Sequence, residues 1–218
     1  MSIKAILFDM DGVLIDSETY YCQGTIDWMI KNGYQGNIDA IYTILGTTME
    51  VTYQILQELF KNKYTIEELT EINETYFKEN PLPYSKILMP GVKELITFLK
   101  ENNIKMAVCS SSPMDVIEKC LTECGILESF DYIVSGEQFE RSKPDPEIYL
   151  HARDVFQLTS DECIVIEDSK LGIDAAVNAK MKVIALHNPK FKQDQSKATW
   201  HIENMLQAID VVKQAMND

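Results

Sequence analysis

The sequence predicts an α/β fold, a doubly wound parallel sheet with an all-helical domain inserted into it. Two observations support this prediction. Short segments that are apolar on both faces alternate with amphipathic segments of helical period, and after the first of them the strand pattern disappears between 16 and 85. Strands of a parallel sheet read as continuous apolar runs because helices cover both sides of the sheet.

The strands and helices of the sheet domain follow in order along the chain. Apolar runs bounded by polar or turn-forming residues predict strands at 3–8, 106–109, 132–134, 163–166 and 183–186, and an edge strand near 199–202. Apolar stripes at helical spacing predict helices across 92–99, 116–121, 173–177 and 205–212. Ser112-Pro113 and Asp145-Pro146 each offer an N-cap residue followed by proline at the first helical position.

The stretch that follows the first predicted strand shows only helical periodicity. Its apolar residues, among them Ile30 and Val51, recur at three- and four-residue intervals. The proline-rich stretch 80–84 reads as a linker that returns the chain to the sheet. An insertion at this point is expected near the sheet edge where open α/β sheets bind ligands. We therefore predict a sheet domain formed by 1–15 and 86–218 and a helical domain at 16–85.

Charge and cysteine content exclude several classes of partner. The chain has 20 Lys and Arg against 34 Asp and Glu, a formal net charge of -14. Nucleic acids and anionic membranes bind basic surfaces, so we exclude both as main partners and take a monomer as the default. Five scattered cysteines, with no visible export signal or membrane span, indicate reduced thiols and a cytoplasmic location. Cys120 and Cys124 are one helical turn apart, and packing explains them better than a metal site.

The first predicted strand runs directly into a pair of acids, in the sequence Asp9-Met10-Asp11-Gly12-Val13. Two carboxylates at the tip of a buried strand present one acid as a nucleophile or metal ligand and leave the other to transfer protons. Asp and Gly are also common in turns, so this motif taken alone is equally consistent with a plain turn.

Three further strand ends carry residues of the kind that bind phosphate or metal. The hydroxyls of Ser110-Ser111-Ser112 precede a predicted helix whose N-terminus attracts anions, although they also suit a simple cap. Lys143, fixed in direction by the following proline, supplies a cation, although most single lysines are solvated. Glu167 and Asp168 suit a hard cation such as Mg2+, although Asp168 also suits a helix cap.

The parallel sheet is expected to bring all four strand ends to one edge. Clustered carboxylates repel one another unless a positive charge lies among them. A divalent cation meets that need, and a phosphate bound to it is then held on its other side by lysine, serine and backbone amides. The residues gathered in this way are Asp9, Asp11, Glu167, Asp168, Ser110 and Lys143.

This order of motifs resembles the haloacid dehalogenase (HAD) superfamily, in its phosphatase and β-phosphoglucomutase-like branch with a helical cap. The resemblance covers the whole chain and rests on 9–13, Ser110, Lys143 and Glu167-Asp168. It implies a Rossmann-like core, a cap domain at 16–85, and phosphoryl transfer with Mg2+ as cofactor. The dehalogenases that named the superfamily lack the second acid, so Asp11 favours phosphoryl transfer.

The resemblance also implies a role for each motif residue. Asp9 would attack phosphorus to give an aspartyl-phosphate, and Asp11 would protonate the leaving alcohol and then deprotonate the hydrolytic water. The implied phosphate-binding residues are Ser110, Ser111 and Lys143. The implied Mg2+ ligands are Asp9, Asp11 through its carbonyl oxygen, Asp168, and Glu167 either directly or at one remove.

Within this branch the sequence favours a hydrolase of small phosphorylated metabolites, such as sugar phosphates, over a sugar phosphomutase. β-Phosphoglucomutase carries a cap histidine and a cap arginine, and an ungapped alignment places Tyr21 and Met49 at those positions. The arginine pairs with the distal phosphate of a bisphosphate intermediate, so its loss weakens the mutase interpretation. Candidate contacts to the leaving group, which equally suit plain packing of the cap, are Glu18, Tyr21, Gly46, Thr47 and Thr48.

Two hypotheses come from other functional classes. A signalling receiver domain also accepts phosphate on an aspartate at a sheet edge, but its acceptor follows a middle strand of the sequence and no helical insertion follows its first strand. A non-catalytic phosphosugar-binding protein could keep the fold, but it would have no need for both Asp9 and Asp11.

Overall fold

A computed structural model describes residues 3–44, 47, 49–189 and 193–217. The chain divides into two compact units, one formed by 1–16 and 84–218 and the other by 17–83. These boundaries differ by one or two residues from the predicted ones. We call the first unit the core and the second the cap, and each is described by itself.

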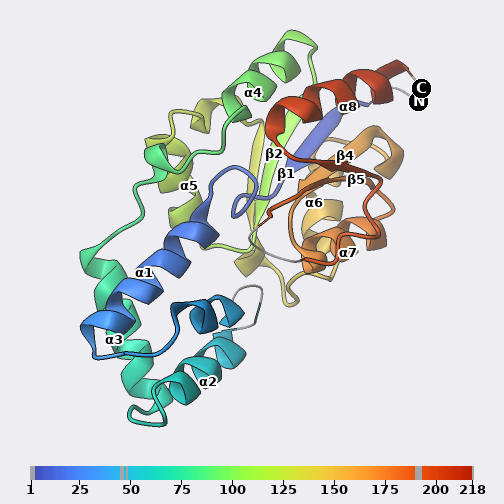
Figure 1. Cartoon of the computed structure of the whole chain (residues 1–218). Coiled ribbons are helices and arrows are strands. Elements are labelled where there is room, and N and C mark those ends of the chain that lie inside the picture. The colour runs from blue at the N-terminus through green and yellow to red at the C-terminus, as the bar shows by residue number, and fades with distance from the viewer. Residues whose placement is uncertain (1–2, 45–46, 48, 190–192, 218) are drawn as a thin grey trace. The chain divides into compact units, whose positions relative to one another are not determined.

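Six strands form one sheet in the part of the core that the structure describes (Figure 1). Every pairing is parallel, so the predicted doubly wound fold is confirmed. In spatial order the strands are β3-β2-β1-β4-β5-β6, which puts β1 in the middle of the sheet. Their bounds are β1 Ala5–Phe8, β2 Lys105–Ser110, β3 Tyr132–Ser135, β4 Cys163–Glu167, β5 Lys182–Leu186 and β6 Trp200–Ile202.

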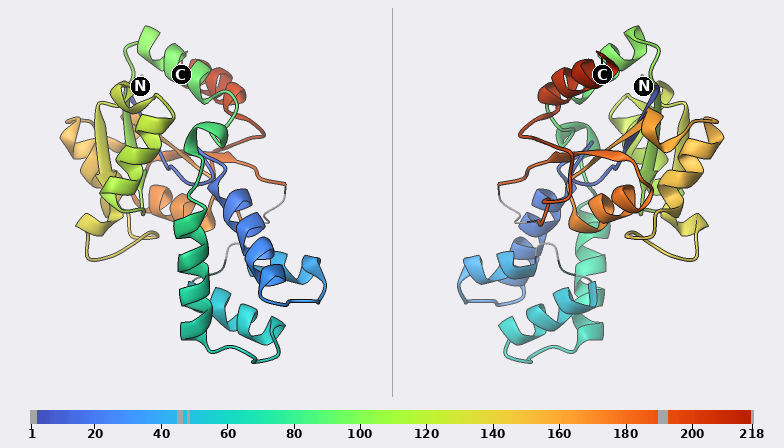
Figure 2. Two further views of the ribbon diagram at one scale, coloured as in Figure 1. Left: turned by 90° about the vertical axis from the view of Figure 1, so that its left-hand side faces the viewer. Right: turned by 90° about the vertical axis from the view of Figure 1, so that its right-hand side faces the viewer.

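Helices cover both faces of this sheet. Helices α4 and α5 lie on one side and α6 and α7 on the other, as the two views of Figure 2 show, and α8 packs beside α4. The longer helices are α4 Val92–Glu101, α5 Met114–Glu123, α6 Glu147–Val155, α7 Lys170–Asn178 and α8 Met205–Asn217. Short 3-10 segments are η2 Tyr84–Lys86, η3 Leu127–Ser129, η4 Gly136–Gln138 and η5 Ser160–Glu162.

Two predicted helix starts need correction. Helix α5 begins at Met114 with Pro113 at the cap position, so Ser112 lies one residue before the cap. Helix α6 likewise begins one residue later than predicted, with Pro146 as its cap. In both cases the serine or aspartate lies outside the helix, and its side chain is free for other contacts. Asp145 accepts a hydrogen bond from the Glu147 amide at 3.1 Å.

The cap is built from helices around a separate apolar cluster. The buried Trp28 ring stacks on Phe60, and its indole N–H donates to the Asn73 side chain at 3.0 Å, which ties two helices together. Four residues of the predicted apolar stripes are exposed: Ile30 (50%) and Val51 (40%) in the cap, and Val177 (37%) and Leu206 (50%), which were predicted to face inward, in the core. The elements are α1 Ser17–Lys31, the 3-10 segment η1 Ile38–Ile44, α2 Met49–Leu59 and α3 Ile66–Glu79.

Two further features concern the residues that the structure describes. None of their helices combines the length and the apolar character needed to cross a membrane. All five cysteines are buried and none of them forms a disulfide, and the Cys124 thiol donates to the Tyr84 carbonyl at 3.3 Å.

We expect Leu7→Ala to destabilise the protein strongly. Leu7 is fully buried on the central strand, next to Ala107 and Val165 of the neighbouring strands. Truncation of a leucine at such a site leaves a cavity and costs about 2 to 5 kcal/mol of the free energy of unfolding. Urea denaturation measures this loss. The matched variant Leu206→Ala, at a residue that is 50% exposed, should lose less than about 1 kcal/mol. Equal losses would contradict the central position of β1.

Candidate active site

The carboxyl ends of the three central strands form the candidate site. In the sheet register Phe8 lies beside Val108 of β2 and Ile166 of β4. The next residue, Asp9, donates its backbone N–H to the Ile166 carbonyl at 3.0 Å. Asp9 therefore leaves the sheet between the ends of β2 and β4, where Ser110 and Glu167 end their strands. This is the meeting of strand ends that the sequence predicts.

The ammonium group of Lys143 lies among these strand ends. Its Nζ donates to Asp9 Oδ1 at 2.5 Å, to Glu167 Oε1 at 2.8 Å and to the Cys109 carbonyl at 3.1 Å. An ammonium group has three donors, and all three are used. The lysine side chain is only 7% exposed, so the ordinary solvated role considered for Lys143 does not apply.

Asp11 and Gly12 form the tight turn after β1. The Ser112 hydroxyl donates to Asp11 Oδ2 at 2.9 Å, which orients this carboxylate from the residue that precedes the α5 cap. Gly12 has a φ of +79°, and a Cβ atom there would overlap the Asp168 carboxylate. Only glycine satisfies both conditions, so the turn after Asp11 depends on it.

The two predicted phosphate-binding serines differ in their environment. Ser110 is buried at the end of β2, and its hydroxyl accepts a hydrogen bond from the Ser112 amide at 3.1 Å. Ser111 is exposed in the segment that leads to α5. Asp168 is not a helix cap, because Ser169 occupies the cap position of α7 and accepts from the Gly172 amide.

Burial and charge set the electrostatics of the site. Burial, reinforced by the neighbouring Glu167 and Asp11 carboxylates, raises the pKa of Asp9 to about 8 even though Lys143 opposes the shift. Burial would also raise the pKa of Glu167, but Lys143 and the hydrogen bonds from Ser169 hold it below its ordinary value. The two carboxylates oppose the effect of burial on Lys143 and hold its pKa well above the ordinary value. The core thus contains more negative charge here than one lysine neutralises.

The donor set fits a hard cation. Asp9, Glu167 and Asp168 are all buried, and one carboxylate oxygen from each lies within 4.8 Å of the other two. Carboxylate and carbonyl oxygens are the ligands that Mg2+ prefers in proteins.

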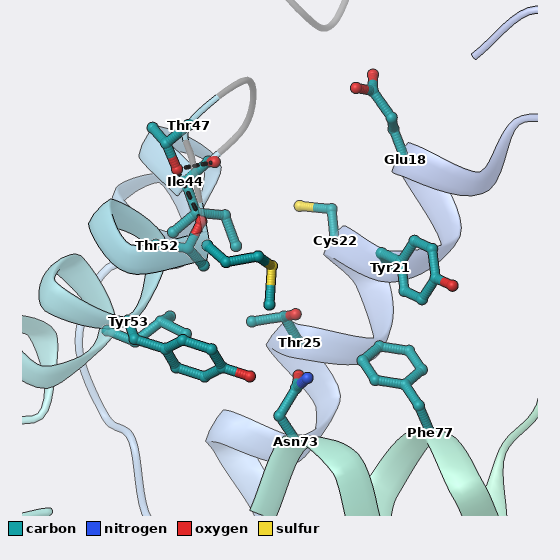
Figure 3. Close-up of a pocket in the computed structure, with 12 residues that line it drawn as sticks. Glu18, Tyr21, Cys22, Thr25, Ile44, Thr47, Thr52, Tyr53, Asn73 and Phe77 are labelled. Atoms are coloured by element: carbon teal, nitrogen blue, oxygen red, sulfur yellow. Dashed lines mark hydrogen bonds between the residues drawn. The ribbon is translucent and has the colours of Figure 1, made fainter. Parts of the chain in front are cut away.

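The cap contains a cavity of its own, with a volume of about 480 Å3 (Figure 3). Three predicted cap residues, Glu18, Tyr21 and Thr47, line it, whereas Gly46 and Thr48 lie outside the described residues. The side chains come from α1, α2, α3 and η1, and from Thr47 between η1 and α2. The other lining residues are Cys22, Thr25, Ile44, Met49, Thr52, Tyr53, Leu56, Asn73 and Phe77.

Several residues of these two regions were not found from the sequence. Tyr149 of α6 donates its hydroxyl to Glu167 Oε1 at 3.0 Å, and Ser112 contacts Asp11 as described above. A tyrosine at an apolar helix position reads as ordinary core, so only the contact reveals it. For Ser112 the run of three serines is the available signal, but a serine before proline equally predicts a helix N-cap. In the cap, nothing in the sequence marks Asn73 as a residue of the cavity, because single polar residues on helices are common.

Comparison with known proteins identifies the family. Residues 6–186 match the family model described as haloacid dehalogenase-like hydrolase. The chain is 32% identical over 184 residues to the phosphorylated carbohydrates phosphatase of Thermotoga maritima, covering 84% of both proteins. The structure of β-phosphoglucomutase from Clostridium difficile has a TM-score of 0.71 and 27% identity, covering 99% of this chain and 97% of that one.

One relative is much longer than this chain. Protein SUPPRESSOR OF QUENCHING 1, chloroplastic, of Arabidopsis thaliana is 35% identical over 191 residues, which cover 84% of this chain but 18% of that protein. The fold and the strand-end site define an α/β enzyme with a carboxylate and lysine centre. The chain belongs to the haloacid dehalogenase-like hydrolase family, which confirms the predicted resemblance.

We expect Gly172→Ala to lower stability although alanine is the better helix former. A Cβ atom at Gly172 would overlap the buried Glu167 carboxylate. Without that contact the change would stabilise α7 by about 1 kcal/mol; with it, we expect overpacking to cost about 1 to 3 kcal/mol net. Thermal unfolding followed by circular dichroism gives the sign. A higher melting temperature would show that α7 does not approach Glu167 this closely.

Proposed function

We propose that this protein is a Mg2+-dependent phosphatase that hydrolyses small phosphate monoesters, with sugar phosphates as the substrate class. The proposal rests on the groups that surround the Asp9 carboxylate. This carboxylate contacts a buried ammonium group and belongs to a cluster of three acids. A phosphoryl-transfer site needs such a nucleophile beside groups that neutralise the charge of the phosphate. The phosphatase of phosphorylated carbohydrates among the relatives supports the substrate class.

The proposed reaction has two steps, both carried by residues of the turn after β1. An oxygen of Asp9 attacks phosphorus, the bond from phosphorus to the ester oxygen breaks, and Asp11 gives its proton to the departing alcohol. Asp11 then takes a proton from water, whose oxygen attacks the aspartyl-phosphate and releases phosphate and Asp9. The Ser112 hydroxyl, at 2.9 Å from Asp11 Oδ2, orients this acid for both proton transfers.

For the transferring phosphoryl group we propose three contacts from the core: Ser110, Ser111 and Lys143. Lys143 supplies the permanent positive charge, and the serines precede the N-terminus of α5, where backbone N–H groups favour anions. A Mg2+ ion would be held by Asp9, Asp168 and the Asp11 carbonyl oxygen, with Glu167 beside them. When bound, it would neutralise charge on the phosphoryl oxygens.

For the organic part of the ester we propose the cap cavity. Glu18 is the one charged residue among the described residues that line it, and no lysine or arginine is among them. The hydroxyls of Thr25 and Tyr53 and the amide of Asn73 suit a sugar or polyol, and Phe77 supplies an apolar wall (Figure 3). A cavity without a cation does not favour a second phosphate, which supports a hydrolase of monophosphates over a phosphomutase.

The remaining expectations stay proposals. We infer a monomer in the cytoplasm, acting on a small phosphorylated metabolite and not on nucleic acid or membrane. Buried cysteines that form no disulfide fit a reducing compartment.

We expect Asp9→Asn to abolish turnover of p-nitrophenyl phosphate in the presence of Mg2+. The amide is a poor nucleophile, so kcat should fall at least about 1000-fold. Release of p-nitrophenol measures the rate, and circular dichroism checks that the variant is folded. Removal of metal with EDTA should stop the wild-type reaction, and added Mg2+ should restore it. Undiminished release from Asp9→Asn, or no release from the wild type, would refute the phosphatase assignment.

We expect Met49→Arg to raise kcat/KM for hydrolysis of a sugar bisphosphate. Met49 is 64% exposed and lines the cap cavity, so an arginine there would place a cation beside the bound sugar. One charge-assisted contact of about 1.5 kcal/mol raises kcat/KM roughly tenfold. We would compare glucose 1,6-bisphosphate with glucose 6-phosphate for wild type and variant.

Val51→Arg is the matched control, because it adds the same charge to the same helix at a residue that does not line the cavity. If both arginines raised kcat/KM for the bisphosphate equally, the cap cavity would not be the region that selects the organic part of the ester. If β-glucose 1-phosphate with catalytic glucose 1,6-bisphosphate gave glucose 6-phosphate faster than free phosphate, the protein would be a phosphomutase.

A further inference from the structure

Every acceptor position of the Glu167 carboxylate is filled by a protein donor. Oε1 accepts from Lys143 Nζ at 2.8 Å and from the Tyr149 hydroxyl at 3.0 Å. Oε2 accepts three bonds, each of 3.0 Å, from the Asp168 amide and from the amide and hydroxyl of Ser169. A carboxylate offers about four lone-pair positions, and five donors converge on this one. A metal ion could bind Glu167 only by displacing one of them.

Tyr149 contributes to this arrangement in two ways. It lies in α6, and its side chain is completely buried. Its hydroxyl fixes Glu167 Oε1, and the Lys143 ammonium lies 5.0 Å from the centre of its ring, within range of a cation–π contact. One side chain therefore contacts both members of the buried ion pair.

Helix α7 closes the other side of Glu167. The Ser169 hydroxyl donates to Oε2 while it accepts from the Gly172 amide at 3.0 Å, so the helix cap and the carboxylate share one hydroxyl. At Gly172 the helix backbone comes so close that any Cβ atom would overlap the carboxylate. The backbone of α7 therefore limits the movement of the Glu167 carboxylate on this side.

We propose that Tyr149 is a positioning residue for the reaction: its hydroxyl holds Glu167 against Lys143, and Glu167 in turn orients the lysine toward Asp9 instead of binding the metal ion. Lys143 would otherwise have the rotational freedom of a four-carbon side chain. Held by Glu167 and the Cys109 carbonyl, its amine keeps one donor on Asp9, where the phosphoryl group is transferred. The role of Tyr149 rests on the proposed function, but its effect on Lys143 can be measured without catalysis.

Tyr149→Phe tests this proposal, because it removes only the hydroxyl. We expect kcat for p-nitrophenyl phosphate at saturating Mg2+ to fall about tenfold, with KM within about twofold of wild type. The 15N resonance of the Lys143 ammonium, observed by NMR in substrate-free protein, should shift or broaden as the lysine loses its fixed position. The matched control is Tyr132→Phe, which removes a tyrosine hydroxyl that pairs with His151 at 2.8 Å in the same unit. It should change neither kcat nor the lysine resonance.

Calorimetric titration of the substrate-free protein with Mg2+ separates the two possible roles of Glu167. If Glu167 orients Lys143, Tyr149→Phe should leave the Mg2+ affinity within about twofold of wild type. If Glu167 were a metal ligand, loss of the hydroxyl that orients it would weaken Mg2+ binding by about 10- to 100-fold, and the proposal would be wrong.

Two other results bear on the proposal. If Tyr149→Phe had the wild-type kcat and an unchanged lysine resonance, Tyr149 would be only a packing residue. The proposal would then be wrong. If the wild type hydrolysed no phosphate ester, the phosphatase proposal would fail, but the lysine resonance and the Mg2+ titration would still decide whether Tyr149 positions Lys143.

Discussion

The buried ion pairs of Lys143 are the interaction on which the rest of the site depends. An ammonium group that is removed from water is costly unless its donors and its charge are matched, and here two carboxylates and one carbonyl match all three donors. Removal of Lys143 would leave the buried Asp9 and Glu167 carboxylates without a compensating charge. The same lysine keeps Asp9 and Glu167 from repelling each other, so it permits two acids to share one sheet edge.

Backbone geometry makes this concentration of charge possible. The parallel register places the ends of β1, β2 and β4 side by side, and two glycines let the chain approach the acids directly. Gly12 makes room for the Asp168 carboxylate and Gly172 for that of Glu167. The backbone of another segment therefore lies directly against each of these two carboxylates and limits where it can point. Such preorganisation is what electrostatic catalysis requires.

The candidate site of the core and the cavity of the cap also differ in charge. A chain with a net charge of -14 does not attract an anionic ester by its overall field, so local groups must do so. In the core these groups are Lys143 and the end of α5, together with any metal held by the acids. The described cap cavity offers no cation. This difference supports the proposal that the core binds the phosphate and the cap selects an uncharged organic group.

The fold class and the order of the motifs follow from the residue pattern, because runs that are apolar on both faces require a parallel sheet whose strand ends meet at one edge. The side-chain contacts follow only from the packing of distant segments. Ser112 reaches Asp11 across 101 positions of the chain and Lys143 reaches Asp9 across 134. Tyr149 reads as core from its pattern, and only the packing of α6 against the sheet turns its hydroxyl toward Glu167. Local periodicity records which face of an element is buried, but not which polar atom it meets there.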